Sequence, residues 1–242
     1  MATTDDRLLG GRVQLRQPLK GYRAAIDPVF LAAAVPAGPG DSVLDLGTGP
    51  GAAALCLAVR TGCAVTGIEL DPAAVTLARE NAVTNAVRFT VIAADIADPA
   101  TSYAGFDHAM ANPPFLGEGQ GTPPPNPGKR AANMAAGGAV DRWVDLAVRA
   151  VRPGGTVTFV YRADQLPGLL AAFPDSAAGV AVFPLWRRAG DTAERVLVQA
   201  RAGGRAPFQL LAGLVLHESA GPYTRAAEAV LRGGSAIDLM AD

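Results

Sequence analysis

The chain of 242 residues has few of the residues that disulfide frameworks and metal centres require, since it holds two cysteines and two histidines. Cys56 and Cys63 lack metal-ligand spacing and are too few for a disulfide framework, so we expect two reduced thiols that act as small apolar residues. No apolar run approaches the roughly 20 residues that span a bilayer, and the polar, acidic segment 1–6 shows no signal peptide. The sequence therefore predicts a cytoplasmic protein with no membrane segment and no bound metal.

The chain also lacks an excess of either charge, with 21 Lys and Arg against 22 Asp and Glu and a formal net charge of -1. A near-neutral chain has no global basic field to attract nucleic acid, so any such binding must depend on local clusters. Half of the residues are hydrophobic, which suits a single sizeable core. We expect residues 1–35, an arm and a helix, to form one domain with the core at 36–242, because no internal repeat or long linker divides them.

Strand-like and helix-like segments alternate along most of the chain. This pattern is typical of a doubly wound, mostly parallel α/β sheet with helices on both faces. We expect seven strands, with the last two paired as a terminal β-hairpin, and leave residues 208–217 as an edge strand or an extended tail. The expected strands are 42–46, 64–69, 87–93, 106–111, 156–161, 179–185 and 194–202, and the expected helices are 27–35, 52–60, 71–85, 139–151, 164–173 and 223–232.

A glycine turn follows the first expected strand, where residues 43–51 read VLDLGTGPG. Glycine is needed in such a turn because a Cβ would block both its geometry and the close approach of a ligand to the backbone. The helix that follows offers unpaired N–H groups at its first turn. The segment therefore predicts a site for a nucleoside ligand.

Two acidic residues follow the next two strands. Glu69 ends strand 64–69 and Asp95 follows strand 87–93. Ligands of open parallel sheets bind at the carboxyl ends of the strands, beside the point where the strand order reverses. There Glu69 can accept hydrogen bonds from ribose hydroxyls, and Asp95 can accept one from the exocyclic amine of adenine.

Two cofactors suit this pattern. A dinucleotide site needs Gly-x-Gly-x-x-Gly/Ala and an acid about twenty residues later, which Gly47, Gly49, Ala52 and Glu69 satisfy loosely. However, the Asp45 carboxylate just before the first glycine disfavours a pyrophosphate and suits the ammonium end of a methionine moiety. We therefore favour S-adenosyl-L-methionine, which carries no phosphate, with S-adenosyl-L-homocysteine as its product.

Asn112-Pro113-Pro114-Phe115 follows the fourth strand and indicates the chemistry. An amide or aryl NH2 is a poor nucleophile because its lone pair is delocalised. The Asn112 side-chain carbonyl and the Pro113 backbone carbonyl can each accept one N–H, which exposes that lone pair to a sulfonium methyl group. The prolines stiffen this acceptor pair, and Phe115 can stack on a planar target base. This motif predicts methylation of an exocyclic amine.

Together, the glycine turn, the two acids and the Asn-Pro-Pro-Phe motif resemble class I S-adenosylmethionine-dependent methyltransferases, which have a Rossmann-like fold. The segments RLLGGR at 7–12 and GYRAAID at 21–27 extend the resemblance to the bacterial tRNA(Val) adenine-N6 methyltransferase family, over residues 7–240. The resemblance implies methylation of N6 of an adenine beside the anticodon. It also implies these cofactor-binding residues: Arg23, Asp27, Asp45, Gly47, Thr48, Gly49, Glu69, Leu70, Asp95, Ile96 and Asn112.

The chain departs from that family at Phe115, where tyrosine is frequent, so stacking is kept and a hydroxyl contact is lost. A tRNA partner would have to bind to local basic groups, and the glycine- and proline-rich loop 117–129 would serve as a lid that orders on substrate or as a disordered segment. The basic residues expected to contact tRNA are Arg12, Arg16, Lys129, Arg130, Arg187 and Arg188.

Several other functions remain open at this stage. Protein glutamine-N5 methyltransferases also use an Asn-Pro-Pro acceptor, but they typically carry a separate helical N-terminal domain, for which about 35 residues are too few. An rRNA adenine or guanine N-methyltransferase is a further alternative. A non-catalytic RNA-binding module would not need the intact turn and Asn112, and a nicotinamide oxidoreductase would need a catalytic pair that the isolated His108 and His217 do not supply.

Overall fold

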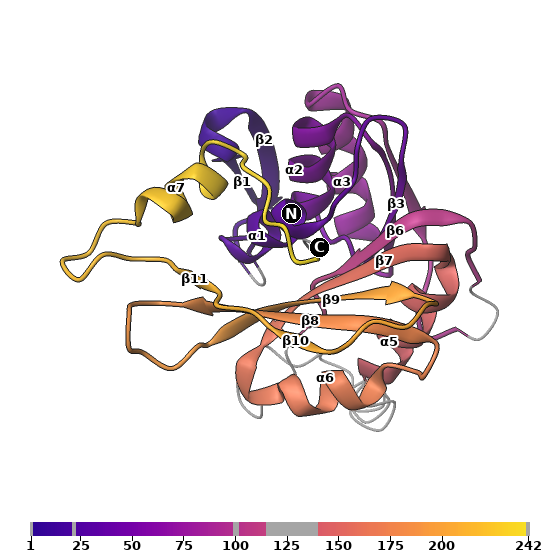
Figure 1. The fold of residues 1–242 in the computed structure, drawn as a ribbon. Helices are drawn as coiled ribbons and strands as arrows, with labels where there is room; N and C mark the ends of the chain where they lie inside the picture. Colours follow the sequence, from indigo (N-terminus) through magenta and orange to yellow (C-terminus); the bar gives the residue numbers. More distant parts are fainter. Residues whose placement is uncertain (1, 21–22, 99–101, 115–139, 241–242) are drawn as a thin grey trace, which may run out of the picture.

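The structure, a computed structural model, describes residues 2–20, 23–98, 102–114 and 140–240. Its centre is a nine-stranded sheet in the order β10-β8-β9-β7-β6-β3-β4-β5, with β11 paired to β8 (Figure 1). Neighbouring strands in the part β7-β6-β3-β4-β5 run parallel, and β9 is antiparallel to both β7 and β8. The strands are β3 (Ser42–Leu46), β4 (Ala64–Glu69), β5 (Phe89–Ala93), β6 (Phe106–Ala111), β7 (Val151–Arg162), β8 (Ala177–Trp186), β9 (Arg195–Ala202), β10 (Gln209–Leu210) and β11 (Leu214–Val215).

The mostly parallel α/β sheet and its terminal hairpin confirm the predicted fold class, and the seven expected strands are all present. The two additional strands, β10 and β11, each contain two residues and pair with β8 in parallel. They account for the segment at 208–217 that the sequence left open. The β7 strand also begins earlier than expected, because Val151 already pairs with Phe106 before an irregularity in register.

Helices cover both faces of the sheet (Figure 1). One apolar cluster joins α1, α2, α3 and α7 to one face, and a second joins α5 and α6 to the other. Successive side chains of β3 point to opposite faces of the sheet, so Val43 belongs to the first cluster and Leu44 and Leu46 belong to the second. The helices are α1 (Asp27–Ala34), α2 (Ala52–Thr61), α3 (Pro72–Thr84), α5 (Val140–Ala150), α6 (Leu166–Ala172) and α7 (Arg225–Leu231), with 3-10 turns η1 (Leu9–Gly11) and η2 (Ala163–Gln165).

The helices flanking the glycine turn begin and end for local reasons. Gly51 and Gly62 bound α2 in the left-handed region, and the Gly62 N–H closes the last turn onto the Ala58 carbonyl. Asp71 caps α3 by accepting a hydrogen bond from the Ala73 N–H, with Pro72 at the first helical position. Ile26 occupies the N-cap position of α1 without a side-chain cap, and the Asp27 side chain is paired with Arg195.

The N-terminal segment is more ordered than the partly irregular arm that the sequence suggests. β1 (Thr3–Leu8) and β2 (Val13–Pro18) form an antiparallel hairpin separate from the main sheet. The side chains of Val13, Leu15 and Gln17 are buried, and their alternation with exposed neighbours shows that β2 lies with one face against the core. The hairpin packs beside α2 and α3 (Figure 1).

Candidate functional site

The strand order places the residues of interest on consecutive strand ends. The chain proceeds from β3 through β4 to β5 on one side, then returns to β6 on the other side of β3. The order therefore reverses between β3 and β6, which is where open α/β sheets bind ligands. Asn112, the glycine turn and Asp95 follow β6, β3 and β5 at this edge, and Glu69 is the last residue of β4. Together they extend over three strand spacings, or about 14 Å.

The three glycines of the turn all have positive φ but differ in their surroundings. A Cβ on Gly47 would lie 2.5 Å from the Trp143 ring, and one on Gly51 would lie 2.6 Å from the Phe89 ring. A Cβ on Gly49 would meet nothing within 4 Å. Gly47 and Gly51 are thus required by the packing beneath the turn, whereas Gly49 borders open space where a ligand can approach.

Asp45 lies beneath the turn and is 2% exposed. The Thr48 hydroxyl donates a 2.5 Å hydrogen bond to its Oδ2. Burial raises the pKa of Asp45 to about 7; the hydrogen bond from Thr48 opposes this rise, and the negative charge of Glu69 adds to it. A buried carboxylate of this kind favours a positively charged ligand group, which would compensate for the water it has lost.

Glu69 holds the turn from the end of β4. Its Oε2 accepts a hydrogen bond from the Gly49 N–H and its Oε1 accepts one from the Asp71 N–H, both at 2.8 Å. A carboxylate has about four acceptor positions, so two remain for the hydroxyls of a ligand. The next residue, Leu70, is 63% exposed.

Asp95 lies one strand further along the edge. The Ala94 N–H donates to the Glu69 carbonyl, which fixes the segment after β5 against the end of β4. The Asp95 Oδ1 accepts from the Ala97 N–H at 2.8 Å. Ile96 is half-buried and packs on the cluster that includes α5.

The Asn-Pro-Pro segment begins directly after β6. The last residue of that strand, Ala111, is buried between Leu46 of β3 and Phe159 of β7. Asn112 is half-buried, Pro113 is buried and Pro114 is exposed. Phe115 lies outside the described residues, as do the loop 117–129, Lys129 and Arg130.

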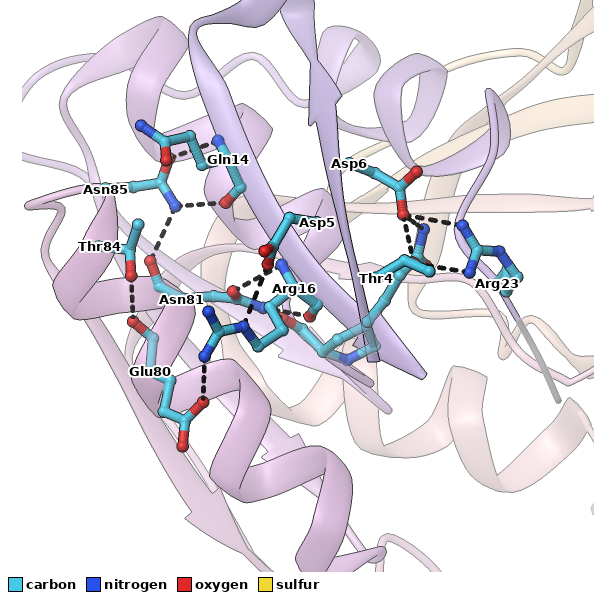
Figure 2. Close-up of polar contacts among 12 residues, drawn as sticks. Thr4, Asp5, Asp6, Gln14, Arg16, Arg23, Glu80, Asn81, Thr84 and Asn85 are labelled. Carbon is cyan, nitrogen blue, oxygen red and sulfur yellow. Dashed lines mark hydrogen bonds and ion pairs between the residues drawn. The ribbon is translucent and has the colours of Figure 1, made fainter. Parts of the chain in front are cut away.

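Arg23 and Asp27 both have partners within the protein. The Arg23 guanidinium donates to Thr4 at 2.7 Å and to Asp6 at 2.8 Å, which ties residue 23 to the hairpin (Figure 2). Asp27 accepts from the Arg195 Nε at 3.0 Å and so joins the start of α1 to the start of β9. Their predicted contact with a cofactor stays a prediction.

The four described basic residues predicted to contact RNA have different surroundings. Arg16 is paired with Asp5 at 3.1 Å and with Glu80 at 3.7 Å (Figure 2). Arg12 donates to the carbonyls of Leu9 and Arg232. Arg187 and Arg188 follow β8, whose end pairs with the start of β9 beside the carboxyl end of β7. Their turn therefore lies at the same edge of the sheet as the site.

Several residues that shape the site were not predicted from the sequence. Trp143 of α5 packs beneath Gly47, and Arg195 pairs with Asp27. Gly67 is needed within β4 because a Cβ there would lie 2.7 Å from Thr48. A glycine inside a strand is a recognised mark of close approach, so Gly67 had a sequence signal, whereas Trp143 and Arg195 had none.

The chemistry of the edge distinguishes between the two cofactors considered. Its side chains are carboxylates and an amide, which are acceptors for ammonium, hydroxyl and amine groups. The Gly49 N–H, which a pyrophosphate would need, already donates to Glu69. The residues present therefore fit a cationic nucleoside without phosphate better than a dinucleotide.

The described ranges bear on membrane and metal binding as well. They contain no helix long and apolar enough to cross a membrane. They also contain no group of three His, Cys, Asp or Glu side chains placed to hold a metal ion. Cys56 and Cys63 are both buried free thiols, as expected.

Comparison with known proteins gives consistent matches. Residues 26–167 match the family model described as "Methyltransferase small domain". The chain is 32% identical over 209 residues to the tRNA1(Val) (adenine(37)-N6)-methyltransferase of Aeromonas salmonicida, covering 84% of this chain and 85% of that protein. A protein of the same name from Actinobacillus succinogenes is 36% identical over 148 residues, or 59% of this chain and 62% of the relative, so the match spans less than two thirds of it.

Solved structures show the same fold. The crystal structure of a predicted O-methyltransferase from Agrobacterium tumefaciens aligns with a TM-score of 0.73 and 25% identity, covering 88% of this chain and 98% of that one. A Thermus thermophilus 16S rRNA N2 methyltransferase, solved with S-adenosylmethionine and guanosine, aligns with a TM-score of 0.57 and 24% identity over 83% of this chain and 50% of that one.

Proposed function

This chain belongs to the methyltransferase small domain family, and from that membership we propose that it transfers a methyl group from S-adenosylmethionine to N6 of an adenine in tRNA. The relatives named for this activity support the proposal, since one of them aligns over 85% of its own length at 32% identity. A tRNA substrate would place its action in the cytoplasm. The observation that carries the proposal is the order of Asn112, the glycine turn, Glu69 and Asp95 on consecutive strand ends.

Each of these residues has a proposed role toward the cofactor. The buried Asp45 carboxylate, with Thr48, would hold the ammonium group of the methionine moiety beneath the turn. Gly49 leaves room for the cofactor to approach the backbone. The remaining acceptor positions of Glu69 would bind the ribose hydroxyls, and Asp95 would accept from the adenine amine. Leu70, which is largely exposed, and Ile96 would contact the base, and Arg23 and Asp27 would lie toward the methionine end.

Asn112 and Pro113 would position the nitrogen that is methylated. When bound, S-adenosylmethionine supplies an electrophilic methyl group on a sulfonium. The side-chain carbonyl of Asn112 and the backbone carbonyl of Pro113 would each accept one N–H of the target amine, which turns its lone pair toward that methyl. Both prolines restrict the backbone, so the two acceptors need little reorganisation during the reaction. Phe115 would stack on the target base.

An amine nitrogen that accepts a methyl group carries a positive charge until it loses one proton. An amine that donates to Asn112 and Pro113 has its positive charge stabilised by their carbonyl dipoles as the new N–C bond forms. The proton then passes to solvent, because neither acceptor is basic enough to keep it. This chain therefore needs no general base of high pKa at the site.

The proposal can be tested by offering several substrates together. Purified protein would be incubated with methyl-labelled S-adenosylmethionine and with separate pools of unmodified tRNA, rRNA and protein. We expect label in tRNA, recovered as N6-methyladenosine after digestion to nucleosides and mass spectrometry. Because the relatives are named for adenine 37 of tRNA1(Val), a transcript of that tRNA with guanine at position 37 is the matched control and should remain unlabelled.

The other outcomes identify the remaining alternatives. Label confined to rRNA would replace tRNA by rRNA as the substrate. Label on glutamine of a protein would indicate a glutamine-N5 methyltransferase, which uses the same acceptor chemistry. Absence of cofactor binding by calorimetry would contradict the proposal entirely.

A further inference from the structure

Asn81 of α3 and Asn85, the C-cap of that helix, bind the edge of the N-terminal hairpin as a neighbouring strand would. The Asn85 side chain accepts from the Gln14 N–H at 2.8 Å and donates to the Gln14 carbonyl at 2.7 Å. The Asn81 side chain does the same to Arg16, with both distances at 2.8 Å (Figure 2). Each amide thus satisfies one donor and one acceptor of the β2 backbone.

The spacing explains why the two pairs fit. Asn81 and Asn85 lie four residues apart on a helix, so their Cβ atoms are about 5–6 Å apart on one face. Gln14 and Arg16 lie two residues apart on a strand, about 6.6–6.8 Å, and their backbone groups point to the same edge. That edge faces away from β1, and the amides pair groups that an edge strand otherwise leaves open.

The third hydrogen bond of each asparagine differs, since the Asn85 Nδ2 donates to the Asn81 carbonyl at 2.8 Å within the last turn of the helix, whereas Asn81 reaches the glycine turn. Its Nδ2 also donates to the Pro50 carbonyl at 2.9 Å, in a buried contact, and the residue is 2% exposed. An amide NH2 has two hydrogens, so one serves the hairpin and the other serves the glycine turn. Pro50 lies between Gly49 and Gly51, in the segment that borders the proposed cofactor.

The surrounding contacts keep the hairpin in register with this amide. Arg16 bridges Asp5 of β1 and Glu80 of α3, the neighbour of Asn81 in sequence. Leu15 is buried on the opposite side of the strand from those charges. The turn itself is closed by a hydrogen bond from the Gly51 N–H to the Thr48 carbonyl at 2.9 Å.

We propose that Asn81 is a positioning residue of the cofactor turn, which couples the shape of that turn to the docking of the N-terminal hairpin. One amide group fixes both Pro50 and the edge of β2, so displacement of the hairpin frees the side chain that holds the Pro50 carbonyl. The inference rests on the proposed function for the role of the turn in cofactor binding. The coupling itself depends only on the contacts of Asn81.

The matched variants are Asn81→Ala and Asn85→Ala. Both remove the two hydrogen bonds that the side chain makes to β2. Asn81→Ala also removes the bond to Pro50, whereas Asn85→Ala also removes the bond to the Asn81 carbonyl at the end of the helix. Asn81→Asp serves as a second variant, because it keeps the volume and the acceptor for the Arg16 N–H while losing the donors for the Pro50 and Arg16 carbonyls. Circular dichroism would establish that each variant is folded.

Hydrogen exchange without cofactor measures the coupling directly. We expect Asn81→Ala and Asn81→Asp to increase exchange of the amides of Thr48, Gly49 and Gly51 by about fivefold or more, whereas Asn85→Ala increases exchange only around Gln14 and at the end of α3. Equal exchange of the turn in the asparagine 81 variants and the wild type would overturn the proposal. So would an equal increase in Asn85→Ala, since docking of the hairpin alone would then explain it.

Steady-state kinetics then test the consequence for the cofactor. Loss of Asn81 should raise the KM for S-adenosylmethionine about tenfold and change kcat by less than about threefold, while Asn85→Ala should change both by less than about twofold. A loss of kcat with an unchanged KM would contradict a role in positioning the turn. If the wild type binds no S-adenosylmethionine, the proposed function fails, and the exchange result still decides the coupling.

Discussion

Asn112 is the residue on which the proposed chemistry depends most directly. It follows β6 without an intervening residue, so its backbone position is set by the pairing of Ala111 with Leu46 and Phe159. A side chain placed by a central strand is held more rigidly than one on a long loop. Its amide is therefore suited to electrostatic preorganisation.

We expect Asn112→Ala to lower kcat for methyl transfer by about 100-fold or more, the scale on which one preorganised polar contact acts. Binding of S-adenosylmethionine, measured by calorimetry, should change by less than about threefold, because Asn112 acts on the amine. Glu69→Ala is the complementary control and should weaken cofactor binding. Methylation at the wild-type rate by Asn112→Ala would disprove the acceptor role.

Asp45 gives a prediction for the pH dependence of stability. Its pKa is raised to about 7 in the folded protein, chiefly by burial, from 3.8 for an ordinary aspartate. The folded state therefore binds more protons than the unfolded state between about pH 4 and 7, and the free energy of unfolding falls as pH rises through that range and levels off above it. The effect is on the order of a few kcal/mol at pH 8.

Asp45→Asn removes this penalty while keeping an acceptor for Thr48. We expect the melting temperature of the variant to exceed that of the wild type at pH 8, with a smaller difference at pH 5. Binding of S-adenosylmethionine should nevertheless weaken by about tenfold or more, because the compensating charge is gone. A stability gain that is equal at both pH values would show that Asp45 does not titrate in this range.

At the scale of the element, the glycine turn combines two demands in five residues. Gly47 and Gly51 must lack a Cβ for the turn to pack on Trp143 and Phe89, whereas Gly49 faces open space. The sequence predicted the turn from the glycines alone. The sequence did not show which glycines are required for packing and which for ligand access, because Trp143 is nearly a hundred residues away in the chain.

We expect Gly47→Ala and Gly49→Ala to differ in kind. The first adds a clash with Trp143 to the strain of a positive φ and should lower the free energy of unfolding by about 2–4 kcal/mol. The second carries only the strain, about 1 kcal/mol, but should weaken cofactor binding by about tenfold. Thermal melts and calorimetry on both variants measure these effects, and a Gly49→Ala protein with wild-type affinity would refute ligand access at that residue.

For the whole molecule, the near-neutral charge means that RNA binding must depend on placement of cations and not on their number. The turn after β8 carries Arg187 and Arg188 at the edge of the sheet where the site lies. Arg16 is instead held by Asp5 and Glu80, so its charge is largely compensated within the protein. Arg187 and Arg188 should therefore contribute more to RNA binding than Arg16.

We expect the double variant Arg187→Ala with Arg188→Ala to raise the Kd for tRNA by about three- to tenfold. The slope of log Kd against log salt concentration should become smaller by about one to two. Arg16→Ala should have a smaller effect. Arg149→Ala, which removes an exposed arginine paired with Asp145 on α5, is the control. Unchanged affinity and salt dependence in the double variant would exclude the β8–β9 turn from RNA binding.

Most of the sheet could be predicted because its signals are local. The bounds of β3, β4 and β6 agree with the expected strands, since apolar runs ending in glycine, acid or Asn-Pro define them within a few residues. The N-terminal hairpin was missed. Its local signals are Gly10-Gly11 and short alternating segments rich in charge, and its position depends on Asn81 and Asn85, more than sixty residues away.

The sequence by itself determined the fold class, the turn with its glycines, the acids after successive strands and the Asn-Pro-Pro segment, because each is encoded by residues that are neighbours in the chain. Only the tertiary structure decided that Glu69 holds the Gly49 N–H, that Asp45 is buried enough for its pKa to reach about 7, and that Asn81 joins the hairpin to Pro50. These features depend on burial and on hydrogen bonds between distant segments. Neither is fixed until the strands adopt their order and the helices cover them.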